Sequence, residues 1–152
     1  MTRFAFGATA AIMTSMALIV GLGSANSGRT AVIGGLLIIA IADNLSDSLS
    51  IHVYQESENL EQRTAFRVTL TNFLTRLVIA LTFVALVVAL PTPWVVAVAV
   101  GAGLVLLSLL TVLLARARRA SVSKEIIKHL AVAAAVIAAS KLIGVWIVAH
   151  VR

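Results

Sequence analysis

Five long apolar segments run through the chain and are separated by short polar stretches. The segments cover residues 4–23, 30–54, 66–90, 93–115 and 126–149. A helix needs roughly 20 mainly apolar residues to cross the hydrocarbon core of a bilayer, and each segment meets this length. The pattern therefore predicts an all-α, polytopic membrane protein with five transmembrane helices. Residues 1–152 are expected to form a single transmembrane domain.

The interruptions between the segments have local causes. Residues 23–28 are rich in Gly, Ser and Asn, which favour a tight turn. Residues 55–63 are polar and contain three glutamates, and residues 116–124 form a basic loop. Pro91 ends the third segment and Pro93 begins the fourth, because proline is tolerated in the first turn of a helix but not in its interior. The first apolar segment exceeds the roughly 7 to 15 residues of a signal-peptide core, so we expect it to be a retained helix.

The composition agrees with a membrane protein and predicts its orientation. Only 12% of the residues are charged and 61% are hydrophobic, which leaves too few charges to cover a soluble domain. With the amino terminus in the cytoplasm, two basic residues lie outside, Arg29 and Arg152, and two lie within the segments. Eight then lie inside: Arg3, Arg63, Arg67, Arg116, Arg118, Arg119, Lys124 and Lys128. The excess of basic residues on the inner side predicts an inside amino terminus and an outside carboxyl terminus. We expect the protein in the inner (plasma) membrane of the cell. Because the basic residues are explained by this topology, we expect no nucleic-acid partner.

The sequence offers little support for catalysis. It has no cysteine, no His-Glu-x-x-His zinc pattern, no phosphate-binding glycine loop and no Gly-x-Ser-x-Gly nucleophile elbow. We therefore expect a protein that is not an enzyme and that holds no permanently bound cofactor.

Polar residues occupy the inner half of the second segment. Asp43 and Asp47 are one helical turn apart and share a face, which Asn44 and Ser48 flank and His52 continues. At about 1.5 Å per residue, Asp43 lies about 18 Å from the polar stretch, near the middle of the membrane, and His52 lies near the inner interface. Ionisable residues at such depth are rare and mark ion paths, proton relays or ion pairs.

Two interpretations of this stretch remain open. Oxygen ligands on one face suit hard divalent cations, and an imidazole shifts the preference toward manganese, iron or zinc. The candidate metal ligands are Asp43, Asn44, Asp47, Ser48, His52 and Glu56. Carboxylates at this depth also carry protons in pumps and transporters. Alternatively, Arg76 and Lys141, which lie within the third and fifth segments, are internal countercharges that form structural ion pairs with the aspartates.

Residues 7–58 resemble the first two helices of the vacuolar iron transporter-like family of membrane metal transporters. The stretch reads GATAAIMTSMALIVGLGSANSGRTAVIGGLLIIAIADNLSDSLSIHVYQESE, with a Gly-led first helix, a Gly-rich turn and a small-residue second helix that ends in acidic residues. The end of the chain, HLAVAAAVIAASKLIGVWI, is similar to the alanine-rich last helix of that family, with its late glycine at Gly144.

The resemblance implies export of ferrous iron or manganese from the cytoplasm, coupled to protons, by a homodimer with the path between its subunits. The chain departs from the family pattern in several places. Its first helix has no early acidic residue, Asp47 stands where a methionine is usual, and Ser50-Ile51-His52 replaces Gly-Glu-Tyr. Residues 55–65 are all that remains of a long acidic cytoplasmic insertion. These changes concern the transported ion more than the fold.

Small residues also predict assembly. Gly7, Ala11 and Ser15 repeat every four residues in the first segment, and alanines do so in the last. Such faces let helices approach closely in lipid, where hydrophobicity gives them no reason to associate. Because five short helices can scarcely enclose a water-filled transport path, the sequence predicts a homodimer.

Overall fold

The structure is a computed structural model that describes residues 2–58 and 61–151, with side chains described from Gly7 onward. Its elements are α1 (Thr2–Ser24), α2 (Arg29–Ile38), the π-helical segment η1 (Ile39–Asp43), α3 (Asn44–Ser57), α4 (Gln62–Ala89), α5 (Thr92–Ala117) and α6 (Val122–His150). Since α2, η1 and α3 follow one another without a break, they form one long helix.

The predicted all-α class is confirmed for the described residues, which contain no strand. Five helices in this part of the chain are long and apolar enough to cross a membrane. Every helix begins before its predicted apolar segment, because it continues into neighbouring polar residues that satisfy helical geometry equally well. Which end of the bundle faces the cytoplasm stays a prediction.

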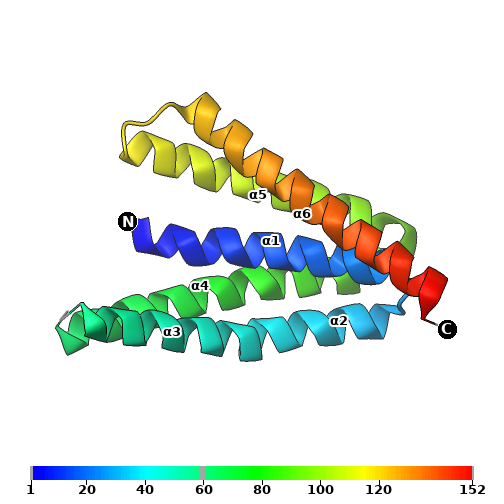
Figure 1. Cartoon of the computed structure of the whole chain (residues 1–152), viewed down its shortest axis with the longest axis horizontal. Coiled ribbons are helices and arrows are strands. Elements are labelled where there is room, and N and C mark those ends of the chain that lie inside the picture. The colour runs from blue at the N-terminus through cyan, green and yellow to red at the C-terminus, as the bar shows by residue number, and fades with distance from the viewer. Residues whose placement is uncertain (1, 59–60, 152) are drawn as a thin grey trace.

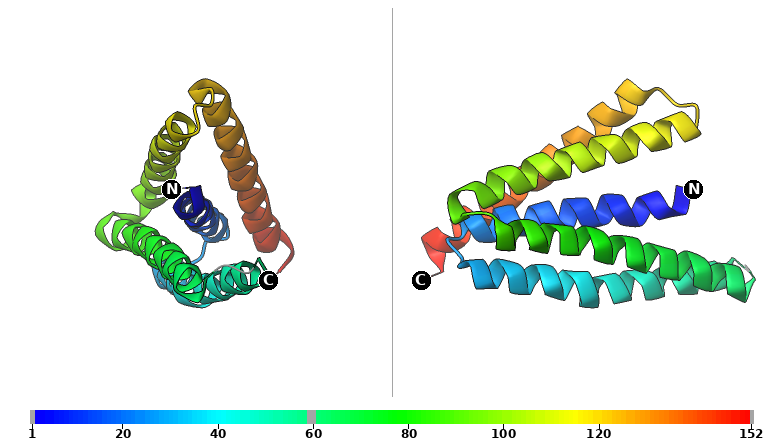
Figure 2. Two further views of the ribbon diagram at one scale, coloured as in Figure 1. Left: turned by 90° about the vertical axis from the view of Figure 1, so that its left-hand side faces the viewer. Right: turned by 180° about the vertical axis from the view of Figure 1, so that it is seen from behind.

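The bundle is arranged around α1, which lies in its centre (Figure 1). The helices α2, α3 and α4 lie on one side of α1, and the hairpin of α5 and α6 lies on the other. Seen along the bundle, α1 lies inside a triangle formed by the remaining helices (Figure 2). The start of the chain and the α3–α4 and α5–α6 connections lie at one end, which we call the amino end, and the last residues lie at the opposite, carboxyl end (Figure 1).

The apolar core lies along the middle and carboxyl half of α1. Met16 and Ile19 of α1 are fully buried, together with Leu36 of α2, Phe83 of α4 and Leu107 of α5. In lipid, close packing of such side chains holds helices together. The interior of the amino half is different, because several of its buried side chains are polar, as described below.

Two helices end in the same hydrogen-bonded turn. After α1, the amide of Ser27 donates to the carbonyl of Leu22 (3.0 Å) and Asn26 takes a left-handed conformation with φ of 55°. After α5, the amide of Ala120 donates to the carbonyl of Ala115 (2.9 Å) and Arg119 takes φ of 54°. These are Schellman motifs, which usually place glycine at the left-handed position. In the first of them Asn26, rather than a neighbouring glycine, takes the positive φ.

Glycine brings α6 against α1 at the carboxyl end. A Cβ atom on Gly144 would overlap the backbone oxygen of Gly21, so the two helices cross here at a distance that a larger residue does not allow. Toward the amino end, α6 leaves its alanines Ala131, Ala135 and Ala139 exposed. By contrast, Gly7, Ala11 and Ser15 of α1 are buried within the protomer and are not free to form an interface between subunits.

Candidate functional site

Arg76 of α4 forms ion pairs with both aspartates of the second transmembrane helix. Its Nη2 atom lies 2.7 Å from Oδ2 of Asp43, and its Nη1 atom donates to Oδ2 of Asp47. The side chain of Arg76 is only 3% exposed, whereas those of Asp43 and Asp47 are 50% and 43% exposed. This Asp–Arg–Asp cluster therefore has a guanidinium on its inner side and two carboxylates on the outer surface of the protomer.

The cluster contains two acidic groups and one basic group. With both carboxylates ionised, its net charge would be −1. Lys141, the second expected countercharge, is exposed on α6 and has no ion-pair partner among the described side chains. The structure thus brings only one of the two predicted bases to Asp43 and Asp47.

A π turn positions Asp43 at the end of η1. The amide of Asn44 reaches back five residues to the carbonyl of Ile39, which widens the helix by one residue. The carbonyl of Ala40 is met instead by the side-chain amide of Asn44, whose Nδ2 atom lies 3.3 Å from it and 2.9 Å from the carbonyl of Phe73 on α4. Single π turns inside α-helices are frequent at functional sites. Sequence reasoning missed this one, and its only local signal is an Asn that can hydrogen-bond to the backbone.

The six predicted metal ligands lie in three different places. Asp43 and Asp47 belong to the cluster, Asn44 and Ser48 are buried toward the bundle interior, and the Nε2 atom of His52 lies 3.3 Å from Oε1 of Glu56. The described residues contain no group of three or more His, Cys, Asp or Glu side chains that could hold a metal ion. One protomer thus offers a metal two carboxylates at mid-membrane, fewer than the four to eight ligands that metals commonly take.

Buried and partly buried polar side chains gather on the neighbouring helices α3 and α4 in the amino half of the bundle. We call this set the polar seam: Asn44, Ser48, His52 and Gln55 of α3, with Thr69, Asn72 and Arg76 of α4. On the opposite side of α3, Leu45, Leu49 and Val53 are exposed. The exposed surface of α3 is therefore apolar along Leu45, Leu49 and Val53 and polar along Ser46, Asp47 and Ser50. Sequence reasoning did not single out Gln55, Thr69 or Asn72, because hydroxyl and amide side chains carry no charge that marks their depth.

The amino end of the seam meets an open recess. This recess has a volume of about 540 Å³ and is lined by His52, Gln62, Arg63, Phe66 and Arg67. His52 belongs to both the seam and the recess, so the two are continuous at that residue.

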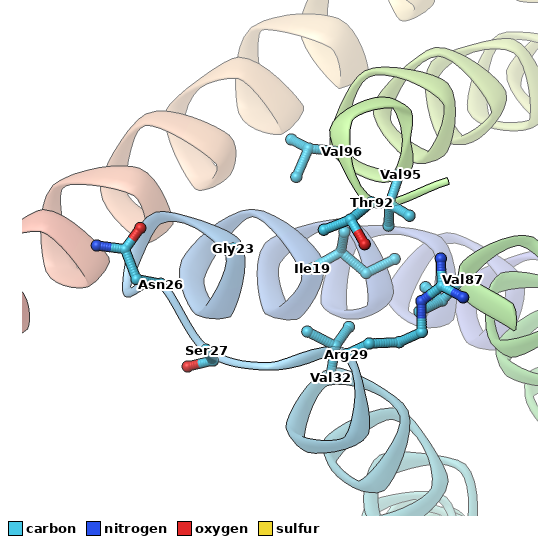
Figure 3. Close-up of a pocket in the computed structure, with 10 residues that line it drawn as sticks. All are labelled: Ile19, Gly23, Asn26, Ser27, Arg29, Val32, Val87, Thr92, Val95 and Val96. Atoms are coloured by element: carbon cyan, nitrogen blue, oxygen red, sulfur yellow. The ribbon is translucent and has the colours of Figure 1, made fainter. Parts of the chain in front are cut away.

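A separate cavity of about 300 Å³ lies at the carboxyl end (Figure 3). Valines from α2, α4 and α5 make up much of its wall, and Arg29 lies at its edge. The guanidinium of Arg29 donates to the carbonyl of Leu90 and lies 3.4 Å from that of Val88, so it caps the end of α4. Since neither aspartate lines it, this cavity is not part of the candidate site.

No protein-family model matches the chain, and no curated protein or solved structure is significantly similar to it. Any assignment of function therefore depends on the geometry of the Asp–Arg–Asp cluster and its surroundings.

Proposed function

We propose that the chain is a subunit of a membrane transporter for divalent cations, ferrous iron or manganese, which leave the cytoplasm in exchange for protons. The observation that supports this proposal is the second carboxylate of the cluster. One aspartate neutralises Arg76, so the other leaves a negative charge on a membrane-spanning helix. A charged side chain at the centre of a membrane helix costs about 2.5 to 3.5 kcal/mol or more, and a cation that binds there removes that cost.

The outer face of the cluster supports assembly with a second copy. Asp43, Ser46, Asp47 and Ser50 form a polar stripe, and all but the partly buried Asp47 are exposed on the protomer surface. A stripe of this kind is unfavourable against lipid and favourable against water or another polar surface. In a homodimer that joins the two stripes, four carboxylates would face a shared path. Four oxygen-bearing side chains approach the ligand number that divalent metals require.

Arg76 then acts as an internal competitor for the metal. It holds Oδ2 of both aspartates from the inside, while both side chains are about half exposed on the protomer surface. A divalent cation arriving from the outer side would weaken these ion pairs without displacing the buried guanidinium. The site would thus be charged in both states and would release its cargo more readily than a closed metal cage.

A second function is favoured by the direct contact of Arg76 with both carboxylates. In this alternative the cluster is a structural ion pair that joins α3 to α4, and the protein transports nothing. Removing one partner of a buried ion pair is strongly destabilising, by about 3 to 5 kcal/mol. A contribution to stability of this size would by itself explain the presence of all three residues.

Flux measurements on the purified protein in liposomes distinguish the two functions. Manganese or ferrous iron is added on one side, and metal-sensitive and pH-sensitive dyes are enclosed on the other. We expect Asp47→Asn to lower metal flux by about tenfold or more, equivalent to ~1.4 kcal/mol or more, while the protein keeps its elution volume and unfolding temperature. The control is Glu58→Gln, an exposed carboxylate at the amino end.

The opposite result favours the structural pair. In that case the wild-type protein moves neither metal nor protons, replacing both Asp43 and Asp47 with Asn lowers the unfolding temperature, and adding Arg76→Gln to that double variant restores it.

A further inference from the structure

The polar seam contains buried polar atoms that have no hydrogen-bond partner among the described residues. Asn72 is 1% exposed, and both atoms of its side-chain amide are unpartnered. The same holds for Oδ1 of Asn44 and Oγ of Ser48, each of which is buried. An unpaired polar group of this kind costs about 1 to 3 kcal/mol, and in native proteins such groups commonly bind ordered water.

These atoms follow the neighbouring helices α3 and α4. The seam residues of α3 extend from Asn44 to Gln55, which is about 16 Å along the helix axis at 1.5 Å per residue. On the antiparallel helix α4, Thr69, Asn72 and Arg76 share one face, on which Asn72 also lies against Gly7 of α1, and the bond from Asn44 to the carbonyl of Phe73 sets the register of α3 and α4. The line ends at Arg76, whose Nε atom is also unpartnered.

The opposite end of the line opens to the recess at the amino end. The Nδ1 atom of His52 is buried and unpartnered, while the same side chain lines the recess. Oε1 of Gln55 and Oγ1 of Thr69 are unpartnered near this end as well. Water in the recess thus has a row of polar atoms leading to the middle of the membrane.

The inner end of this line meets Arg76, and both of its aspartates lie directly beyond the guanidinium. Arg63 and Arg67 line the open recess, where solvent and salt screen them, and Glu56 pairs with His52 there. Among the described side chains, the charged groups farther inside are Arg76 and its two aspartates, so the carboxylates outnumber the guanidinium there. No carboxylate lies between the two ends among the described residues, so a metal ion that gave up its hydration shell would find no charged ligand on the way.

We propose that the polar seam is a water-filled path inside each protomer, which carries protons between the amino end and the Asp–Arg–Asp cluster. Protons would pass along hydrogen-bonded water and exchange with the carboxylates from within, while the metal binds them from the outer face. The presence of water in the seam does not depend on the transport function proposed above, but the assignment of protons to it rests on that function.

Single cysteines test for the water, because the natural chain has none. Ser48→Cys and Thr69→Cys place a thiol in the seam, and Leu49→Cys and Leu70→Cys place one at the same depth on the exposed apolar surface. The probe is Ag⁺, a small thiol-reactive cation, applied to the full-length protein in liposomes. Thiols that remain free are labelled with maleimide after denaturation and counted by mass spectrometry.

We expect the seam cysteines to react at least about tenfold faster than the matched surface cysteines, since a thiol forms its reactive thiolate in water and not in hydrocarbon. Equal, slow reaction of all four variants would overturn the proposal. Elution volume and unfolding temperature of each variant exclude a folding defect as the cause of a fast reaction.

A substitution in the seam then tests the assignment of protons. Asn72→Leu replaces the amide with an apolar side chain of similar size, and we expect the proton flux that accompanies metal flux to fall by about tenfold. Leu74→Ala, on the exposed side of the same helix, is the control. Reactive seam cysteines with unchanged proton flux in Asn72→Leu would overturn the proton assignment. Reactive cysteines in a protein that moves no metal would instead overturn the proposed transport and leave the hydrated seam in place.

Discussion

Gly7 of α1 lies directly against Asn72 of α4. A Cβ atom on Gly7 would overlap Oδ1 of Asn72 and come within 3.3 Å of Cγ of Arg76. The amino half of the central helix therefore packs on the same face of α4 that carries the Asp–Arg–Asp cluster and the polar seam. Any side chain at position 7 would push on both.

The first prediction concerns this contact. We expect Gly7→Ala to lower the free energy of unfolding by about 1 to 3 kcal/mol, the usual cost of overpacking, measured by thermal or SDS-induced unfolding in detergent. Gly101→Ala is the matched control, because Gly101 is helical, exposed and has open space around it. There alanine is expected to be neutral or to stabilise by up to about 1 kcal/mol.

Shortening the facing side chain provides the internal check. Asn72→Ser in the Gly7→Ala background should recover part of the loss, since residues in contact give non-additive effects. If the two substitutions were additive, the contact between α1 and α4 would not be the cause.

The second prediction follows from the charge count of the cluster. Asp43→Asn or Asp47→Asn alone leaves one carboxylate facing Arg76 and should change stability little. The double variant leaves the buried guanidinium without a partner and should lose about 3 to 5 kcal/mol. Adding Arg76→Met to the double variant should restore most of that loss. Two equal and additive losses from the single variants would contradict this account.

The sequence predicted the spans well but could not predict how they turn about their axes. The five helices follow from apolar length, and the depth of Asp43 and Asp47 follows from the helical rise. The sequence gives no direct sign of the π turn at residues 39–43. This turn contains one extra residue, so it changes which side chains before and after it lie on the same face of the helix. Asn44 and Ser48 were expected beside the aspartates as ligands, and they point instead into the bundle.

The sequence also could not predict which helices pack side by side. Arg76 and Lys141 both interrupt apolar helices, and their depth alone made them equivalent partners for the aspartates. In the fold, α4 packs beside α3, whereas Lys141 lies exposed on α6. Which of two helices lies next to a third depends on packing between residues far apart in sequence, such as Gly144 against Gly21.

The third prediction concerns Asn44 as the residue that maintains the π turn. Asn44→Ala removes the side-chain bonds to the carbonyls of Ala40 and Phe73. The carbonyl of Phe73 keeps its backbone bond within α4, whereas that of Ala40 loses its partner at the π turn, at a cost of about 1 to 3 kcal/mol. We expect lower stability and faster amide hydrogen exchange at residues 39–44. Ser46→Ala, two positions along on the exposed side, should show neither effect. Unchanged exchange in Asn44→Ala would show that the π turn is held by other contacts.

The fourth prediction uses the left-handed turn after α5. Arg119 takes φ of 54°, a conformation that costs a side-chain-bearing residue about 1 to 2 kcal/mol and costs glycine little. Arg119→Gly should therefore raise the free energy of unfolding by about 1 kcal/mol. Arg118, its neighbour, has φ of −92°, so Arg118→Gly removes the same charge without relieving strain and should not stabilise. A gain of similar size in both variants would indicate that loss of charge, rather than backbone conformation, is responsible.

The fifth prediction tests whether a second copy covers the aspartates. If the polar stripe of one protomer faces that of its partner, Ser46→Cys and Ser50→Cys lie near the two-fold axis. Each should form a disulfide-linked dimer when membranes are treated with a mild oxidant. Leu113→Cys, exposed on α5 far from the stripe in the sequence, is the control that should remain monomeric on gels. Cross-linking through Leu113 and not through the serines would place the interface on α5 and leave Asp43 and Asp47 facing lipid, a position in which two half-exposed carboxylates with one guanidinium between them are hard to sustain.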